Sequence, residues 1–524
     1  MLVTLAMLGV LAGCGGGGSG GGAGGGGNTG GGGSTAWVQG VFQPASTFAD
    51  RCATPRIGAF PDVQGTTVDE NNWLRSWSND LYLWYDEIVD RNPATFQTLA
   101  YFDLLKTSAL TPSGNPKDRF HFHMPTDEWE ALSQSGISAG YGANWALVSP
   151  VPPREIRVAY TEPGSPATEP SIDLVRGTLV LEIDGVDAVN DGTQAGVDVL
   201  NAALFPGDVG ESHTFTIRDP GSNVSRIVTI TSVEVTSTPV QQVGTVAAVG
   251  GEVGYVLFNE HIATSERGLI DAVDQLRAAG IVDLVLDVRY NGGGFLDIAN
   301  QLAYMLAGDA QTAGKTFETL RFNAKHPSID PVTGRSLAPM SFIDTTVGFS
   351  VPAGQPLPTL DLSRVFVLTG PGTCSASESV INALLGIDVE VIQVGSTTCG
   401  KPYGFYPADN CGTTYFSIQF RGENHKGFGD YPDGFSPANA AGAPGIVNAG
   451  CSVADDFTRS LGDPSEHRLA AALAYRETQS CPAPSGLAPA GNVASSVISR
   501  PGAIDAIDAR VHRPPGLPGK VMLR

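Results

Sequence analysis

The chain has 524 residues, of which 42% are hydrophobic and 16% are charged, a composition typical of globular proteins that bury a core. The length favours more than one domain, because single domains usually contain about 100–200 residues. The formal net charge is −22. Nucleic-acid binding rests on clustered Lys and Arg, and no such cluster occurs, so this class of partner is excluded.

The first 14 residues form an apolar run that ends in Leu11-Ala12-Gly13-Cys14. Small residues before a cysteine resemble the bacterial lipoprotein signal, which implies cleavage before Cys14 and lipidation of its sulfur. The run is too short to span about 30 Å of hydrocarbon. The resemblance implies a lipid-anchored protein of the bacterial cell envelope, on the periplasmic side of the outer membrane. Residues 15–35 are rich in Gly and Ser and are expected to form a flexible tether.

Six further cysteines are Cys52, Cys374, Cys399, Cys411, Cys451 and Cys481. An even number in an exported protein favours disulfides, and the spacings do not resemble a zinc site. We expect Cys399 to pair with Cys411, across a turn, and Cys451 to pair with Cys481. Fifteen connectivities are possible for six cysteines. A bond between Cys374 and Cys399 would alter the site described below.

Residues 36–133 carry helical patterns with aromatic positions between Trp73 and Tyr85, and we expect an N-terminal helical domain. From residue 134 the pattern changes to short strands and turns. The segment Ser138–Trp145 leads into a strand, and a Gly-Ser-Pro-Ala turn, the strand 177–185 and the helix 195–203 follow. This order resembles a PDZ domain over residues 134–240.

The resemblance implies a role for the loop Gly140-Tyr141-Gly142-Ala143. In that family the loop offers backbone N–H groups to the terminal carboxylate of a peptide, which adds as a strand to the sheet edge. Residues 136–140 also match G-x-S-x-G, the nucleophile elbow of α/β-hydrolases. That motif requires a strand before the serine and a helix after it. Here the preceding segment 127–133 is predicted to be helix and loop, and a strand is predicted to follow, so Ser138 is rejected as a nucleophile.

An alternating α/β pattern covers residues 241–481. Strands are expected at 253–258, 282–287 and 365–368, and each is followed by a helix, at 265–279, 295–307 and 375–385. Repeated units of this kind indicate a mainly parallel sheet with both faces covered. Catalytic groups then belong on the turns at the strand ends.

A serine and a lysine occupy two of these turns. Ser375 begins a helix in Thr-Cys-Ser-Ala-Ser-Glu, and Lys401 follows the next strand in Thr-Cys-Gly-Lys. A serine alcohol needs a base held beside it, and lysine can be that base only if burial lowers its pKa. The N–H groups of Ala376, Gly293 and Gly294 are expected to form an oxyanion hole, because glycine lets the backbone approach the substrate.

The group that orients Lys401 stays open between Glu378, one helical turn after Ser375, and Asp388, in the following loop. Ser377 is the nearest competitor as nucleophile. A Ser–His–Asp triad through His261 or His425 also remains open, because such triads are recognised by geometry. His261, beside Phe258-Asn259-Glu260, is more consistent with a structural or substrate-lining role, and Cys374 with a disulfide.

Three motifs together resemble the carboxyl-terminal processing peptidases, also called tail-specific proteases. They are Asp-Val-Arg-Tyr-Asn-Gly-Gly-Gly at 287–294, Ser-Ala-Ser-Glu at 375–378 and Thr-Cys-Gly-Lys at 398–401, and the likeness covers residues 36–480. The resemblance implies a ClpP/crotonase-like catalytic domain, with Ser375 as nucleophile and Lys401 as general base. Some relatives have a glutamine four residues after the lysine, where this chain has Phe405.

These features predict a multidomain α/β protein that is an exported, lipid-anchored serine endopeptidase with a Ser–Lys dyad. Its PDZ-like domain would bind the C-termini of unfolded or tail-tagged envelope proteins. No metal or cofactor is expected. The alternatives are a non-catalytic envelope scaffold, and an esterase or amidase with the same dyad. Residues 482–524, rich in Pro, Gly and Ala, are expected to be an extended or disordered tail.

Overall fold

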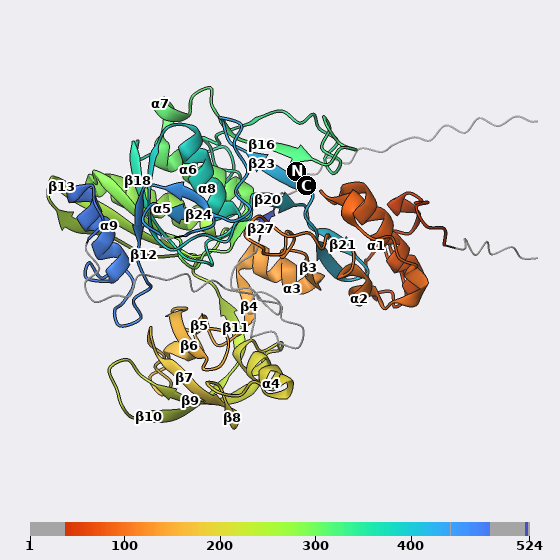
Figure 1. Cartoon of the computed structure of the whole chain (residues 1–524), viewed down its shortest axis with the longest axis horizontal. Helices are drawn as coiled ribbons and strands as arrows, with labels where there is room; N and C mark the ends of the chain where they lie inside the picture. The colour runs from red at the N-terminus through yellow and green to blue at the C-terminus, as the bar shows by residue number, and fades with distance from the viewer. Residues whose placement is uncertain (1–36, 441, 483–518, 522–524) are drawn as a thin grey trace, which may run out of the picture.

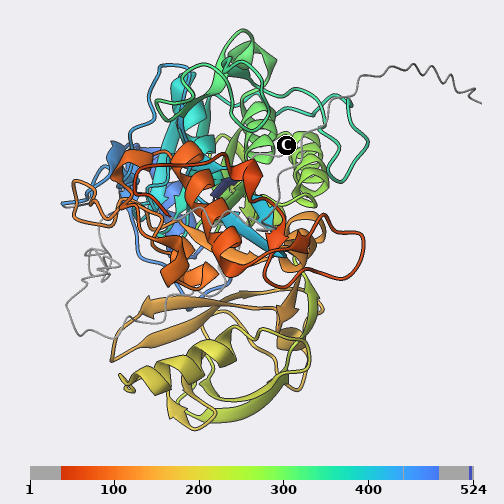
Figure 2. The same ribbon diagram turned by 90° about the vertical axis from the view of Figure 1, so that its right-hand side faces the viewer.

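Three regions follow one another along the chain in the computed structural model, which describes residues 37–440, 442–482 and 519–521. A helical region, a small sheet domain and a large α/β domain are visible in Figure 1, and Figure 2 shows the small sheet domain below the other two. The helices are α1 (Thr67–Leu81), α2 (Thr98–Phe102), α3 (Thr126–Glu130), α4 (Gln194–Leu204), α5 (Ser265–Ala279), α6 (Leu296–Ala307), α7 (Asp309–Thr312), α8 (Ala376–Gly386) and α9 (His467–Thr478). None of the described helices is long and apolar enough to cross a membrane.

The N-terminal region is built around α1, whose first turn is closed by a capping box between Thr66 and Asp69. Trp73 and Trp77 lie one turn apart and stack at 5.4 Å. They pack into a cluster that includes Tyr415 of the large domain. This region also contains three short strands, β1 (Arg51–Cys52), β2 (Val63–Gln64) and β3 (Phe122–Pro125). Since β3 pairs with β22 (Thr413–Phe416), this region is joined to the large domain by both sheet and core.

The second region has its own core and its own antiparallel sheet, with the order β10-β9-β7-β6-β5 and β8 paired to β7. Its strands are β5 (Ala143–Ser149), β6 (Glu155–Thr161), β7 (Leu179–Ile183), β8 (Val186–Asp187), β9 (Ser212–Arg218) and β10 (Ser225–Thr231). Alternating burial along β9 and β10 places one face on the core with α4 and the other in solvent. Two further strands, β4 (Ile137–Gly140) and β11 (Val233–Thr236), pair with each other where the chain enters and leaves this domain.

The large domain contains a six-stranded sheet in the order β12-β13-β14-β18-β19-β26. Its strands are β12 (Val240–Ala248), β13 (Gly251–Phe258), β14 (Asp283–Asp287), β18 (Arg364–Thr369), β19 (Glu390–Gly395) and β26 (Gly450–Ser452). Only the β12–β13 pair is antiparallel. The expected alternation of strands and helices is therefore present, and β14 is buried at every position because helices cover both faces.

A second, mixed sheet lies beside the first, in the order β15-β27-β20-β23-β16-β17. Its strands are β15 (Gly293–Phe295), β16 (Thr316–Phe322), β17 (Met340–Ser341), β20 (Tyr403–Phe405), β23 (Phe420–Glu423) and β27 (Gly519–Val521). The remaining short strands are β21 (Ala408–Asn410), β22, β24 (Phe435–Pro437) and β25 (Ile446–Asn448). Strand β27 comes from the region expected to be a tail, and it pairs with β15 and β20.

Candidate active site

Ser375 stands at the junction between β18 and α8, where the backbone is strained. Its φ is 58° and its ψ is −110°, in a region that residues other than glycine rarely adopt. The residue is fully buried, and its Oγ has no hydrogen-bond partner among the described residues. A strained serine with a buried, unpaired hydroxyl at a helix N-terminus is unusual for a cap and matches the geometry of a nucleophile.

Lys401 follows β19 through the turn 396–400 and is also fully buried. Its Nζ lies 4.7 Å from the ring centre of Phe120 and 4.5 Å from that of Phe405. Phe405 stands where some relatives are expected to have a glutamine, so an aromatic face occupies that position. The lysine stem and head are thus enclosed by apolar rings from two parts of the chain.

Glu378 links the serine and the lysine through their backbones. Its Oε2 accepts the N–H of Ser375 at 2.9 Å and the N–H of Lys401 at 2.8 Å. Its Oε1 accepts the N–H of Gly400 at 2.8 Å and the hydroxyl of Thr398 at 2.5 Å. Burial raises the pKa of Glu378, and the four donated hydrogen bonds oppose this by stabilising the carboxylate. Glu378 therefore sets the position of both turns rather than presenting its carboxylate to the side chains of the pair.

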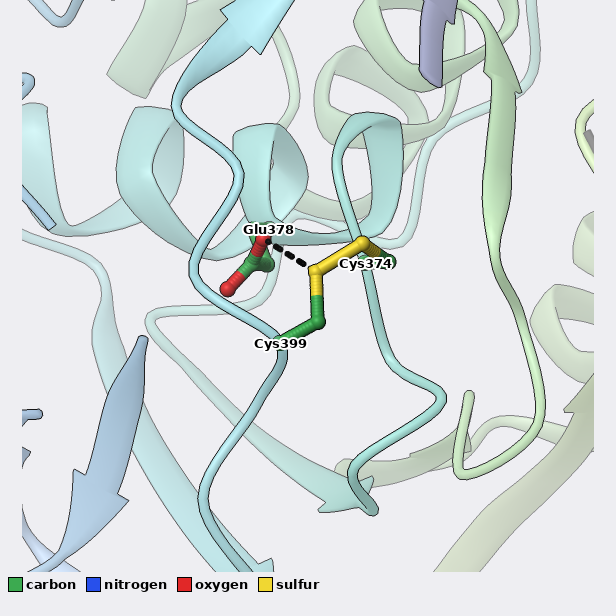
Figure 3. A group of neighbouring side chains, drawn as sticks. All are labelled: Cys374, Glu378 and Cys399. Atoms are coloured by element: carbon green, nitrogen blue, oxygen red, sulfur yellow. Dashed lines mark hydrogen bonds between the residues drawn. A yellow bond between two sulfur atoms is a disulfide. The ribbon is translucent and has the colours of Figure 1, made fainter. Parts of the chain in front are cut away.

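A disulfide between Cys374 and Cys399 joins the same two turns, as Figure 3 shows beside Glu378. The sulfur of Cys399 lies 3.4 Å from Oε2 of Glu378. Although these three residues are close enough to hold a metal, bonded sulfurs cannot act as thiolate ligands. Cys374 is likewise unavailable as a nucleophile.

The expected pairing of Cys399 with Cys411 is wrong. Cys411 instead bonds Cys52, 359 residues away in sequence, and so ties the N-terminal region to the large domain. The pairing of Cys451 with Cys481 is confirmed. The expectation failed because it rested on proximity in sequence, whereas β20 and β21 intervene and carry Cys411 away from the turn of Cys399.

The glycine turn after β14 passes directly beside Ser375. A Cβ on Gly293 would lie 2.9 Å from the carbonyl oxygen of Cys374 and 3.0 Å from the nitrogen of Ala376. A Cβ on Gly294 would lie 2.2 Å from the carbonyl oxygen of His261. Because φ is +103° and +136° at the two positions, only glycine fits both the space and the backbone conformation.

Asn291 holds this turn in place. Its Oδ1 accepts the N–H of Gly293 at 3.0 Å and lies 2.9 Å from Nδ1 of His261. Burial lowers the pKa of His261 to about 3, so the ring is neutral and donates through Nδ1. Of the three N–H groups expected to bind an oxyanion, that of Gly293 is therefore already donated to Asn291. His261 supports the turn, and within the described part of the chain no carboxylate pairs with it as a Ser–His–Asp triad would require.

The other candidates from the sequence lie in structural roles. Ser377 donates its hydroxyl to the carbonyl oxygen of Asn291 at 3.1 Å. Asp388 is exposed and pairs with Lys426 at 2.6 Å, so it does not orient the buried Lys401. His425 accepts the N–H of Thr316 at the surface. Ser138 lies on the exposed side of β4, opposite Val235.

Residues 252–404 match peptidase family S41, a segment that includes both Ser375 and Lys401. The chain therefore contains a peptidase family S41 domain. A carboxyl-terminal-processing protease from Picosynechococcus sp. (strain ATCC 27264 / PCC 7002 / PR-6) is 27% identical over 270 residues, or 52% of this chain. The match spans a little over half of that relative, 56% of its length. A solved structure from Bacteroides fragilis NCTC 9343, named as an S41 protease, shares the fold with a TM-score of 0.57. It is 21% identical, and the superposition covers 81% of this chain and all of the other.

The S41 domain is connected to the small sheet domain by a buried charge cluster that the sequence did not reveal. Arg289, in the motif after β14, contacts Asp455 at 2.7 Å and Glu466 at 2.9 Å. Arg176 of the small domain contacts Asp455 at 2.6 Å and the Tyr290 hydroxyl at 2.7 Å. Although burial alone raises the pKa of Asp455, the neighbouring guanidinium groups hold it well below its usual range. The cluster fixes the strand end that leads into the glycine turn.

The loop expected to bind peptide carboxylates connects β4 to β5 in the small domain. Tyr141 is buried there, and its hydroxyl donates to the carbonyl oxygen of Ala203 at the end of α4, at 3.0 Å. Gly142 has a φ of +74°, and a Cβ there would lie 2.2 Å from Ser165. Gly140 ends β4 and Ala143 begins β5. The Tyr141 side chain is thus unavailable to a ligand bound at this loop. Cys14 and the tether lie outside the described residues.

Proposed function

We propose that this protein is a serine endopeptidase in which Ser375 is the nucleophile and Lys401 the general base. The observation that carries the proposal is that both residues donate their backbone N–H to one oxygen of Glu378, at 2.9 and 2.8 Å. This carboxylate, the disulfide and the glycine turn hold the two residues in a fixed arrangement within the S41 domain. Fixed placement of nucleophile and base is the main requirement for this chemistry.

In the proposed reaction, neutral Lys401 accepts the proton of the Ser375 hydroxyl while Oγ attacks the carbonyl carbon of the scissile peptide. The oxyanion is bound by N–H groups of Gly294 and Ala376, each worth about 2.7–4 kcal/mol of barrier in such sites. The lysine ammonium then gives its proton to the leaving amine, and an acyl-enzyme remains on Ser375. Water attacks the ester, losing a proton to Lys401, and Ser375 recovers its proton as the carboxylic acid leaves.

The small sheet domain, residues 134–240, is proposed to act as a PDZ-type reader of substrate C-termini. Strand β5 ends its sheet and pairs only with β6 in the described part of the chain, so its other edge is available to an added strand. Activity on peptides with a free C-terminal carboxylate should exceed activity on the same peptides as C-terminal amides. Equal rates for the two series would contradict this role.

Export and a lipid anchor at Cys14 complete the proposal. The three disulfides among the described residues support an oxidising compartment, because such bonds persist mainly in exported proteins. Metabolic labelling with a radioactive fatty acid should mark the wild-type protein and not Cys14→Ser. Label that remains on Cys14→Ser would overturn the anchor.

The dyad is tested with the full chain and a fluorescein-labelled unfolded casein. Ser375→Ala and Lys401→Ala are expected to abolish cleavage. Two matched controls, Ser138→Ala and Lys426→Ala, change exposed residues of the same type and are expected to cleave normally. Cleavage that survives both active-site substitutions would exclude the dyad. Hydrolysis of simple esters without any cleavage of casein or peptides would favour the esterase, and inactivity of the parent on all of them would favour the scaffold.

A further inference from the structure

The last strand of the chain lies inside the candidate active site. Strand β27, Gly519–Val521, pairs in parallel with β15 on one side and with β20 on the other. Gly293 is opposite Gly519, and Lys520 lies between Gly294 and Gly404. Strand β27 is thus the middle one of three adjacent strands. The two outer strands, β15 and β20, lie more than 100 residues earlier in the sequence. In Figure 1 the β27 label stands directly beside β20.

The two outer strands carry the two sides of the proposed site. Strand β15 is the glycine turn whose first residue packs against the backbone on both sides of Ser375. Strand β20 begins two residues after Lys401. Helix α8, which begins directly after Ser375, also lies against β27. A peptide in this position therefore passes between the nucleophile and base segments.

Without β27, the sheet has a strand-wide gap between β15 and β20. Both would then present unpaired backbone N–H and carbonyl groups toward the gap, which is the arrangement that captures an extended peptide by backbone pairing. Such pairing depends little on the side chains of the incoming strand. The gap therefore suits any unfolded chain that can enter in an extended conformation, including residues 519–521 of the same chain.

We propose that residues 519–521 of this chain are the resting occupant of the substrate-binding gap between β15 and β20, and that substrates must displace them. This inference rests on the proposed function and deepens it, because it makes the chain's own tail a competitor of the substrate. An internal competitor raises the apparent KM and leaves kcat unchanged, because saturating substrate displaces it. Because the strand belongs to the same chain, it competes with substrate as an intramolecular ligand, and weak pairing can suffice for occupancy.

The main test compares the full chain with the same chain lacking residues 519–524. The deletion is expected to lower the KM for a fluorogenic peptide several-fold with kcat preserved. A synthetic peptide with the sequence of residues 514–524 should inhibit the deletion variant competitively. Unchanged KM together with no inhibition by this peptide would overturn the proposal.

A point substitution in β27 separates the effect of losing its backbone pairing from the effect of shortening the chain. Because strands flank β27 on both sides, each of its N–H groups faces a pairing partner, and Val521→Pro removes one of them. This variant should lower KM in the same direction as the deletion, whereas Val521→Ile, which keeps the backbone donor, should behave as the parent. Equal KM values for Val521→Pro and Val521→Ile would contradict pairing of the tail in the gap.

The fate of the tail and its binding can be read without substrate turnover. Intact-mass measurement compares the parent with Ser375→Ala. Loss of C-terminal residues from the parent but not from Ser375→Ala would support access of the tail to the site. If neither the full nor the shortened chain cleaves anything, the proposed function fails. The inference is then judged by binding of the labelled 514–524 peptide to the shortened Ser375→Ala chain. Saturable binding supports the inference, and absence of binding overturns it.

Discussion

The backbone nitrogens of Ser375 and Lys401 donate to the same atom, Oε2 of Glu378, at 2.9 and 2.8 Å. The proposed nucleophile and the proposed base are thus positioned by a group that sits between their turns. A buried carboxylate that accepts four hydrogen bonds is costly to alter, because each buried donor left without an acceptor lowers the stability by about 1–3 kcal/mol.

Glu378→Gln should lower kcat by about 100-fold, the effect expected when reacting groups shift by about an ångström. The amide keeps one acceptor oxygen but presents an NH₂ group to donors, so one pair of hydrogen bonds is lost. KM should change little, because the hydrogen bonds of Glu378 go to the turns at Ser375 and 398–401 and not to β15 or β20. Steady-state kinetics on a fluorogenic peptide would measure both. Asp388→Asn, in the exposed alternative candidate, is the matched control, and an equal loss in the two variants would refute the positioning role.

Removal of the Cys374–Cys399 disulfide should reduce both stability and kcat. The double substitution Cys374→Ala/Cys399→Ala releases the two turns that carry Ser375 and Lys401. Native disulfides typically contribute about 2–4 kcal/mol to the free energy of unfolding, which differential scanning calorimetry would report as a lower Tm.

The control is Cys451→Ala/Cys481→Ala, which opens a bond between β26 and the segment after α9. We expect it to lower Tm comparably and to leave kcat close to the parent value at a temperature where both proteins are folded. A larger loss of kcat in the control pair would contradict a specific role for the bond at the site.

Gly294→Ala should destabilise the protein strongly, because the new Cβ would lie 2.2 Å from the carbonyl oxygen of His261 at a φ of +136°. Backbone strain alone costs about 1–3 kcal/mol at such positions, and the collision adds to it. Gly314→Ala provides the comparison, because φ is +70° but nothing lies within 4 Å of its Cβ. Urea denaturation should show the larger decrease for Gly294→Ala. A similar decrease at both positions would mean that the close approach to His261 is relaxed in solution.

Glu162 makes stability depend on pH at the boundary of the small domain. Burial raises its pKa from 4.5 to about 7, with the nearby Glu260 acting in the same direction, while the Thr238 N–H and the Gln241 side chain partly oppose the shift. The folded state therefore binds more protons than the unfolded state between these values. Its contribution is fully present below pH 4.5 and is lost as the pH rises to about 7.

Glu162→Gln removes this titration, so its Tm relative to the parent should increase as the pH rises from 4.5 toward 7. Tm measurements across that window would detect the change. Glu182→Gln alters an exposed carboxyl of the same sheet and should run parallel to the parent. A constant Tm difference for Glu162→Gln would show that this carboxyl is not the source of the pH dependence.

Short motifs and local periodicity were sufficient to predict several features. The strands and helices of the α/β domain follow from runs of apolar residues with glycine turns between them, and Ser375, Lys401 and the glycine turn stand in contiguous motifs. These features depend on residues near one another in sequence, which a single chain displays directly.

The remaining features depend on pairings across long stretches of chain. Glu378 was one of two candidates for the third group, and only the folded turns show that it holds Ser375 and Lys401 through their backbones while Asp388 faces solvent. The cysteine pairs follow the same rule, because Cys52 and Cys411 meet only after the N-terminal region docks. Strand β27 has three residues and no periodic pattern, and backbone pairing with β15 and β20 is what defines it. Sequence alone therefore determined the proposed reactive residues and the elements that carry them. The tertiary structure decided what holds these residues in place and which strand lies between β15 and β20, because both depend on contacts between segments that are separate in the sequence.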